Sequence, residues 1–88
     1  MPYYVYLLGS IKKAKIKTYV GYTNNLKHRI SKHNLGKGAK STKGRKWIIL
    51  YYKKYSVKQK AMSNEYILKK NRKKRKEILS KYLATNQL

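Results

Sequence analysis

The sequence predicts a small α/β domain of the α+β type, in which three strands share one sheet and helices cover it. Three short runs rich in aromatic and β-branched residues are typical of strands, and stretches with helical periodicity follow the second and third runs. The predicted order is therefore β-β-α-β-α-α. The chain has 88 residues and no internal repeat, which fits a single domain.

The first two strands are predicted at residues 3–9 and 17–22. The segment YYVYLLG combines aromatic and aliphatic residues and ends at a turn glycine, and KTYVGY is a shorter run of the same kind. The polar segment SIKKAKIK between them is interpreted as a connector. Because the two strands are short and close in sequence, we expect them to pair as an antiparallel hairpin.

A helix is predicted after the second strand, ending near residue 35. Thr23 or Asn24 is its expected N-cap, since short polar side chains accept hydrogen bonds from the first free amides of a helix. Leu26 and Ile30 are four residues apart and form its apolar stripe. This stripe predicts that the helix packs on the sheet.

A glycine-rich loop and the third strand come next. Residues 36–46 hold three glycines and five cations, which indicates a loop, and WIILYYKKY at residues 47–55 is the strongest strand signal in the chain. Ser56 and Gln59 then fit a capping box at the start of a helix over residues 57–70.

Asn71 can cap or break that helix, and a last basic helix is predicted over residues 72–83. The domain is therefore expected to span residues 1–83. Residues 84–88 are predicted to be a frayed C-terminal tail.

Positive charge dominates the composition. Lysine and arginine number 24 against 2 acids, which gives a formal net charge of +22. Self-repulsion on this scale favours a polyanionic partner, and nucleic acid bound mainly through its phosphates is the expected one. Charge that serves only solubility is the alternative. A protein partner and any oligomeric state are left open by the sequence.

The absence of cysteine excludes a disulfide framework and a thiolate metal site. No apolar run reaches the roughly 20 residues of a membrane span. The apolar N-terminus lacks the positive region of a signal peptide, so a cytoplasmic location and no membrane contact are expected.

Glu65 stands out because acids are so rare. With Val57 at zero on a helical wheel, Glu65 falls at about 80°, beside Ala61 at about 40° and Leu68 at about 20°. A carboxylate inside this apolar arc needs cations, hydrogen bonds or a metal to offset its desolvation. An ion pair with a lysine or arginine is the alternative to a metal site, and Glu77 is interpreted as a solvated helix residue.

One carboxylate limits the possible chemistry. It suffices for a one-metal phosphodiesterase, because water and phosphate oxygens can fill the other positions around Mg²⁺. It excludes a two-metal site and a paired-carboxylate glycosidase.

Arg29 and His33 lie beside the apolar stripe of their helix, where it should meet the sheet. Arginine binds phosphate with a planar fork, and histidine can move a proton or orient water. A surface arginine and a capping or surface histidine are the alternatives. Each of the ten tyrosines is by default a core or stacking residue, with a pKa near ~10 that neighbouring cations could lower.

These pieces, in this order and spacing, resemble the GIY-YIG nuclease domain over about residues 3 to 79. The first motif is YVY, with Tyr4 where the family name has glycine, and the second is YVG. NLKHRISKH and AMSNEYILKK follow. The chain is also similar to small single-domain bacterial members of the family, which are related to the N-terminal domain of the bacterial repair excinuclease.

The resemblance implies a three-stranded antiparallel sheet flanked by helices, and hydrolysis of DNA phosphodiester bonds with one divalent metal, Mg²⁺ or Mn²⁺. Tyr6 would activate or orient the attacking water, and Tyr19 would be its partner. Arg29 would bind the scissile phosphate, and His33 would assist proton transfer. Glu65 would hold the metal.

Gly21 would keep the strand end open for close backbone approach. Other expected nucleic-acid contacts are basic residues of the glycine-rich loop and the later helices: Lys37, Lys40, Lys43, Arg45, Lys69 and Arg72. Some members carry an asparagine twelve residues after the glutamate, where this chain has Glu77. The main alternative function is a non-catalytic basic protein that binds DNA or ribosomal RNA.

Overall fold

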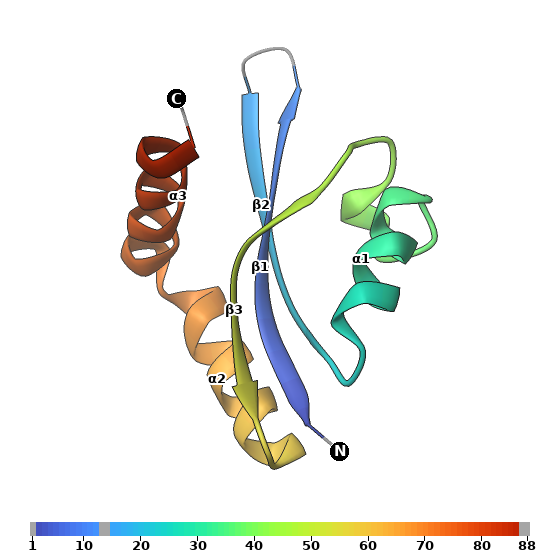
Figure 1. Ribbon diagram of the computed structural model, residues 1–88, viewed down its shortest axis with the longest axis vertical. Helices are drawn as coiled ribbons and strands as arrows, with labels where there is room; N and C mark the ends of the chain where they lie inside the picture. The colour runs from blue at the N-terminus through green and yellow to red at the C-terminus, as the bar shows by residue number, and fades with distance from the viewer. Residues whose placement is uncertain (1, 13–14, 87–88) are drawn as a thin grey trace.

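The computed structural model describes residues 2–12 and 15–86, and it confirms the predicted fold class and element order. Strands β1 (Tyr3–Lys12), β2 (Lys15–Thr23) and β3 (Ile48–Tyr55) form one antiparallel sheet in the order β2-β1-β3. The first strand is therefore central, with a neighbour on each side (Figure 1).

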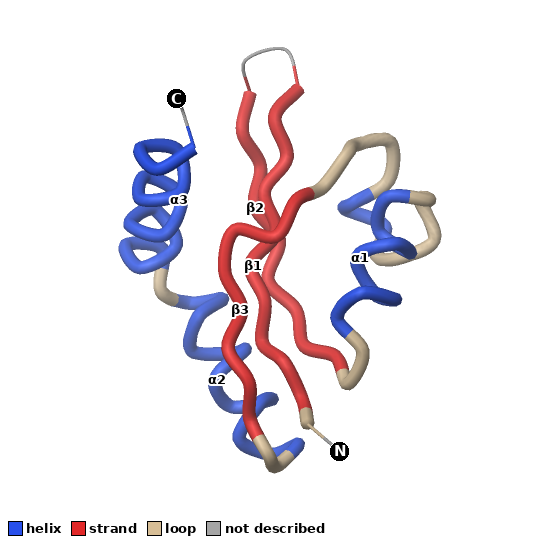
Figure 2. Tube along the Cα trace, viewed as in Figure 1, coloured by secondary structure: helices blue, strands red, loops and turns tan. Residues whose placement is uncertain are grey.

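The hairpin is longer than predicted. β1 and β2 stay paired as far as Lys12 opposite Lys15, whereas pairing with β3 ends at Gly9 opposite Ile48. Figure 2 shows β1 and β2 continuing together beyond the point where β3 begins. The interpretation of the polar segment as a connector was wrong, because backbone hydrogen bonds build a ladder whether or not the side chains are apolar.

Arg45 fastens this extended hairpin to the loop that precedes β3. Its guanidinium donates hydrogen bonds to Ser10 Oγ at 3.2 Å, to the Ser10 carbonyl at 3.2 Å and to the Lys15 carbonyl at 3.1 Å. The side chain was expected to contact nucleic acid, but these three bonds give it a structural role.

The helices lie on both sides of the sheet. α1 (Leu26–Asn34) covers one face, and α2 (Lys58–Lys70) with α3 (Arg72–Asn86) lies on the other (Figure 1). A short 3-10 turn, η1 (Lys40–Thr42), interrupts the loop between α1 and β3.

Two of the predicted helix starts are wrong. The N-cap of α1 is Asn25, whose Oδ1 accepts a hydrogen bond from the His28 amide at 3.1 Å, because Thr23 is still paired in β2. α2 begins after Val57, which makes no side-chain capping bond, so Ser56 lies outside the predicted capping box.

The end of α2 follows the prediction for Asn71. This residue terminates α2, and its Oδ1 then accepts from the Lys74 amide at 3.0 Å at the start of α3. α3 continues to Asn86 and not to the predicted end at residue 83. Residues 87–88 of the predicted tail lie outside the described residues.

The central strand is buried on both faces. Val5 and Leu7 pack with α2 on one side, and Tyr6 and Leu8 pack with Trp47 on the side of α1. This alternation follows from the two-residue period of a strand, and it aims Tyr6 at α1. Among the described helices, none has the length and apolar character needed to cross a bilayer.

Candidate active site

Three rings from three elements meet under α1. Tyr6 of β1 and Tyr19 of β2 have ring centroids 6.4 Å apart, and His33 of α1 lies 6.0 Å from the first and 4.9 Å from the second. Gly21 pairs with Tyr6 across the hairpin, so the register of β1 and β2 sets the two tyrosines side by side. The fold thus gathers three of the residues that the sequence placed in one site.

His33 is bonded through both of its ring nitrogens. Nε2 lies 3.0 Å from the Tyr6 hydroxyl oxygen, and Nδ1 lies 2.9 Å from Thr42 Oγ1. The side chain is 0% exposed, so the alternative of a surface histidine is wrong. Burial, and then the positive charge of Arg29, lower the pKa of His33, which keeps the imidazole neutral near pH 7.

Arg29 lies one helical turn before His33 and interacts with both tyrosines. Hydrogen bonding to the Tyr6 hydroxyl is the main reason why the pKa of Arg29 is raised, and Tyr19 adds to the effect. The guanidinium is half-buried, so it keeps access to solvent while it faces the phenols. This position suits an anion that approaches the two hydroxyl groups.

The pKa of Tyr6 is raised, although the neighbouring cation was expected to lower it. Burial dominates over the stabilising hydrogen bond from Arg29, and the charges of Tyr19 and Glu65 raise the pKa further. Tyr6 is therefore a neutral phenol at pH 7 that can donate to His33. A standing phenolate is disfavoured.

Glu65 lies on α2, which packs on β1 and β2 from the face opposite α1. It is half-buried between Ala61 and Leu68, as its place on the helical wheel predicts, and its charge reaches Tyr6. Within residues 2–12 and 15–86 no hydrogen bond or ion pair occupies its carboxylate. The expected alternative of an ion pair is therefore not what holds it.

The residues present fit a metal ion whose remaining ligands come from water and the substrate. In the described part of the chain no three His, Cys, Asp or Glu side chains come together, and His33 has no free ring nitrogen. Glu65 alone would be the protein ligand. Mg²⁺ accepts one carboxylate when water and phosphate oxygens fill its other positions.

Gly21 is required by the packing of Tyr6. A Cβ at residue 21 would lie 2.6 Å from Tyr6 Cζ and 3.1 Å from Cε1. The glycine was expected to leave room for nucleic-acid backbone, but the Tyr6 phenol fills that room. Its role is to let the ring lie flat across β2 and reach His33.

We expect Gly21→Ala to destabilise the domain by about 1–3 kcal/mol, the range for overpacking a filled core, and to move Tyr6 away from His33. Urea unfolding and the NMR shifts of the Tyr6 and His33 rings measure both effects. Gly44→Ala is the matched control, since its Cβ meets nothing within 4 Å and only its φ of +77° opposes the change. Unchanged ring shifts in Gly21→Ala would contradict the packing role.

Sequence reasoning missed the residues that enclose His33. Thr42 bonds its Nδ1, and a Cβ on Gly38 would lie 2.9 Å from the ring carbons Cγ and Cε1. Trp47 donates its indole N–H to the Thr42 carbonyl at 2.8 Å, and Asn34 exchanges two hydrogen bonds with the Trp47 backbone. Gly38 and Thr42 lie in a segment that resembles any glycine-rich loop, and no spacing relative to His33 distinguishes them.

The remaining predicted nucleic-acid contacts lie on two separate segments. Lys37, Lys40 and Lys43 are exposed on the loop next to α1, while Lys69 and Arg72 are exposed where α2 meets α3 on the other side of the sheet. Lys37, Lys40 and Lys43 are therefore on the same side of the sheet as the ring cluster, and Lys69 and Arg72 are not.

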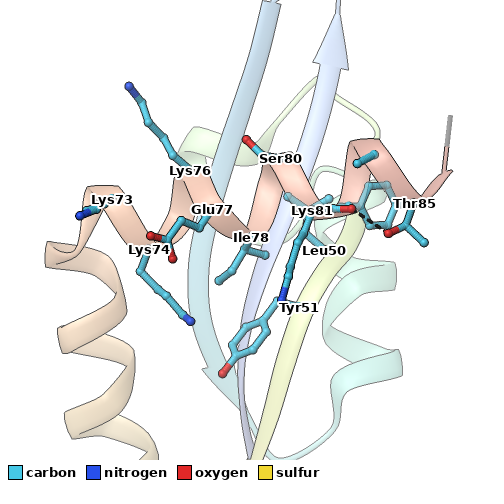
Figure 3. A pocket seen from close by; sticks show the side chains of 12 residues that line it. Leu50, Tyr51, Lys73, Lys74, Lys76, Glu77, Ile78, Ser80, Lys81 and Thr85 are labelled. Atoms are coloured by element: carbon cyan, nitrogen blue, oxygen red, sulfur yellow. Dashed lines mark hydrogen bonds between the residues drawn. The ribbon is translucent and has the colours of Figure 1, made fainter.

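A groove of about 1050 Å³ lies away from the ring cluster, between α3 and β3. Figure 3 shows α3, with Lys73, Lys74 and Glu77, lying over Leu50 and Tyr51 of the sheet. No predicted catalytic residue lines this groove. The groove and the candidate catalytic residues are therefore at separate places on the domain.

Known proteins resemble this chain over most of its length. The GIY-YIG catalytic domain matches residues 2–78. A UPF0213 protein of Oceanobacillus iheyensis is 47% identical over 68 residues, which cover 76% of this chain and 76% of the relative. A UPF0213 protein of Streptococcus pyogenes serotype M3 is 45% identical over 85 residues, covering 96% and 87%.

A solved structure shares the fold. The solution NMR structure of a UPF0213 protein from Bacillus halodurans superposes with a TM-score of 0.55 at 36% sequence identity. The superposition covers 100% of this chain and 97% of that chain. The shared architecture thus extends over nearly all of both chains.

Proposed function

We propose that this chain, which belongs to the GIY-YIG catalytic domain family, is a metal-dependent endonuclease. It would hydrolyse phosphodiester bonds of DNA. The family implies a nucleic-acid substrate, and a net charge of +22 suits one. The observation that carries the proposal is the buried hydrogen bond from Tyr6 to His33, next to Arg29 and within reach of the Glu65 charge.

In this proposal Arg29 binds the scissile phosphate. Its guanidinium already faces the Tyr6 and Tyr19 hydroxyls, so a phosphate on this fork would lie beside the two phenols. The same positive charge would stabilise the negative charge that develops on the phosphoryl oxygens during water attack. Tyr19 would orient the water or the phosphate.

Tyr6 and His33 move the proton. As the water oxygen attacks phosphorus, a water proton passes to the Tyr6 oxygen while the Tyr6 proton passes to His33 Nε2. The bond from phosphorus to the leaving sugar oxygen breaks, and that oxygen takes a proton from solvent. This route uses Tyr6 in its neutral form, which its raised pKa favours.

Glu65 would hold one Mg²⁺ or Mn²⁺ together with water and substrate oxygens. The ion, when bound, supplies polarisation of a phosphoryl oxygen. The free Glu65 carboxylate supports this assignment, as does its electrostatic effect on the pKa of Tyr6.

A non-catalytic nucleic-acid-binding protein on the same fold is the second candidate. The lysine-rich surface favours it, since charge alone binds phosphates. Binding by charge alone does not require the Tyr6–His33 pair together with Arg29 and Glu65, and for this reason the nuclease is the better supported function.

The test is cleavage of labelled duplex and branched DNA by the purified chain. We expect nicking or cutting with Mg²⁺ or Mn²⁺ and none when EDTA removes the ion. Binding measured in parallel should weaken steeply with salt under either function, so binding alone does not decide. DNA that is bound but stays intact with both ions would favour the non-catalytic protein.

A further inference from the structure

We infer that Thr42 is a positioning residue, which fixes His33 in the tautomer whose Nε2 accepts the Tyr6 proton. The inference rests on the proposed function, because it names what orients the proton acceptor of that reaction. Thr42 lies in η1, and its side chain is 0% exposed, directly behind the imidazole.

The argument is a count of hydrogens. A threonine hydroxyl has one hydrogen, and Thr42 Oγ1 donates it to the Ala39 carbonyl at 2.8 Å, which can only accept. Toward His33, 2.9 Å away, Thr42 Oγ1 can then only accept. Nδ1 must therefore carry the hydrogen of a neutral imidazole.

The other ring nitrogen follows from this. With its hydrogen on Nδ1, neutral His33 presents a lone pair at Nε2, and the Tyr6 hydroxyl 3.0 Å away must donate to it. The chain of bonds runs in one direction, from Tyr6 through His33 and Thr42 to the Ala39 carbonyl. A proton that leaves Tyr6 has its acceptor in place before the substrate binds.

The orientation of Thr42 is itself held from outside. Its carbonyl accepts the Trp47 indole N–H at 2.8 Å, and its amide donates to the Ala39 carbonyl at 3.1 Å. Asn34 fixes the Trp47 backbone from α1, so the same helix that carries His33 anchors the loop that carries Thr42. The distance between the His33 and Thr42 side chains is thus fixed by one connected set of hydrogen bonds.

The surroundings keep His33 neutral, as the tautomer argument requires. Arg29 of α1 faces the ring with a positive charge, and the rings of Tyr6 of β1 and Tyr19 of β2 lie against it. Glu65 of α2 acts on Tyr6. The Thr42 hydroxyl is therefore the group that determines which ring nitrogen of His33 carries the hydrogen.

Nitrogen NMR of the protein labelled with ¹⁵N tests the inference without any nuclease assay. We expect wild-type His33 to show a protonated Nδ1 and an unprotonated Nε2. Thr42→Val keeps the size of the side chain and removes the acceptor, so Nδ1 should lose its preference for the hydrogen. Thr42→Ser restores the hydroxyl and should restore the wild-type pattern, and thermal unfolding verifies that each variant is folded.

Cleavage rates complete the test. Outer residues that orient metal-bound histidines contribute roughly 10- to 100-fold, and we expect a loss of similar size here: Thr42→Val should cleave that much more slowly and Thr42→Ser should recover. Wild-type His33 protonated at Nε2 would overturn the inference, as would a Thr42→Val variant with unchanged tautomer or unchanged cleavage. If Thr42→Val does not fold, the wild-type spectrum and the comparison of Thr42→Ser with Thr42→Ala decide in the same way. An inactive wild type with the expected tautomer would refute the nuclease proposal and, with it, the role of Thr42 in catalysis.

Discussion

Replacing Glu65 by alanine is expected to abolish metal-dependent DNA cleavage and to leave DNA binding almost unchanged. A metal ion supplies several kcal/mol of transition-state stabilisation, and each ~1.4 kcal/mol is tenfold in rate, so the loss should be roughly a thousandfold or more. Binding should persist because the substitution removes a negative charge from a chain of net charge +22. Cleavage time courses and filter binding at one salt concentration measure the two effects.

Glu77→Ala is the matched control for this variant. It removes the chain's other acid, changes the net charge by the same amount, and lies exposed on α3 away from the ring cluster. We expect it to cleave like the wild type. If Glu65→Ala and Glu77→Ala cleave equally well, Glu65 is not the metal ligand, and the non-catalytic binding protein becomes the better description.

The fold was predictable because its signals are local. Alternating apolar residues place the strands, and the Leu26 and Ile30 stripe places α1 on the sheet, where both residues do pack. Polar stretches gave the errors. The hairpin extends through lysines that carry no strand signal, and its support by Arg45 joins residues far apart in the chain.

The candidate site was predictable in part. The four-residue spacing of Arg29 and His33 sets them on one side of α1, and the helical wheel sets Glu65 among apolar residues. The depth of His33 was not predictable, because Gly38 and Thr42 cover it from a loop that folds back over the helix. Such contacts depend on the closed loop and leave no periodic trace in the sequence.

The protonation of Tyr6 could not be predicted for a related reason. From the sequence, a tyrosine close to arginine and lysines should ionise more easily. In the fold the phenol is 2% exposed, and burial outweighs the cation. The sign of the pKa shift is thus a property of packing, and it changes the proposed role of Tyr6 from a standing base to a residue that passes a proton on.

We expect Tyr6→Phe to lower the cleavage rate by about 10²- to 10⁴-fold, the range for losing a positioned proton-transfer group. The ring stays in place, so Gly21 still packs against it. His33 Nε2 loses its donor and stays buried without a partner, which should cost about 1–3 kcal/mol of unfolding free energy. Single-turnover cleavage with saturating Mg²⁺ and urea unfolding separate the kinetic effect from the effect on stability.

Tyr66→Phe is the control for Tyr6→Phe. It removes a hydroxyl from a tyrosine of α2 that is 60% exposed and takes no part in the ring cluster, so it should cleave like the wild type.

The acid side of the wild-type pH profile tests the same proton path, because His33 accepts only when neutral. Its pKa is lowered from 6.5, so activity should persist at pH 6.5 and fall only in more acidic solution. If Tyr6→Phe cleaves at the wild-type rate with the same profile, the proton does not pass through Tyr6, and water must lose it directly to another group.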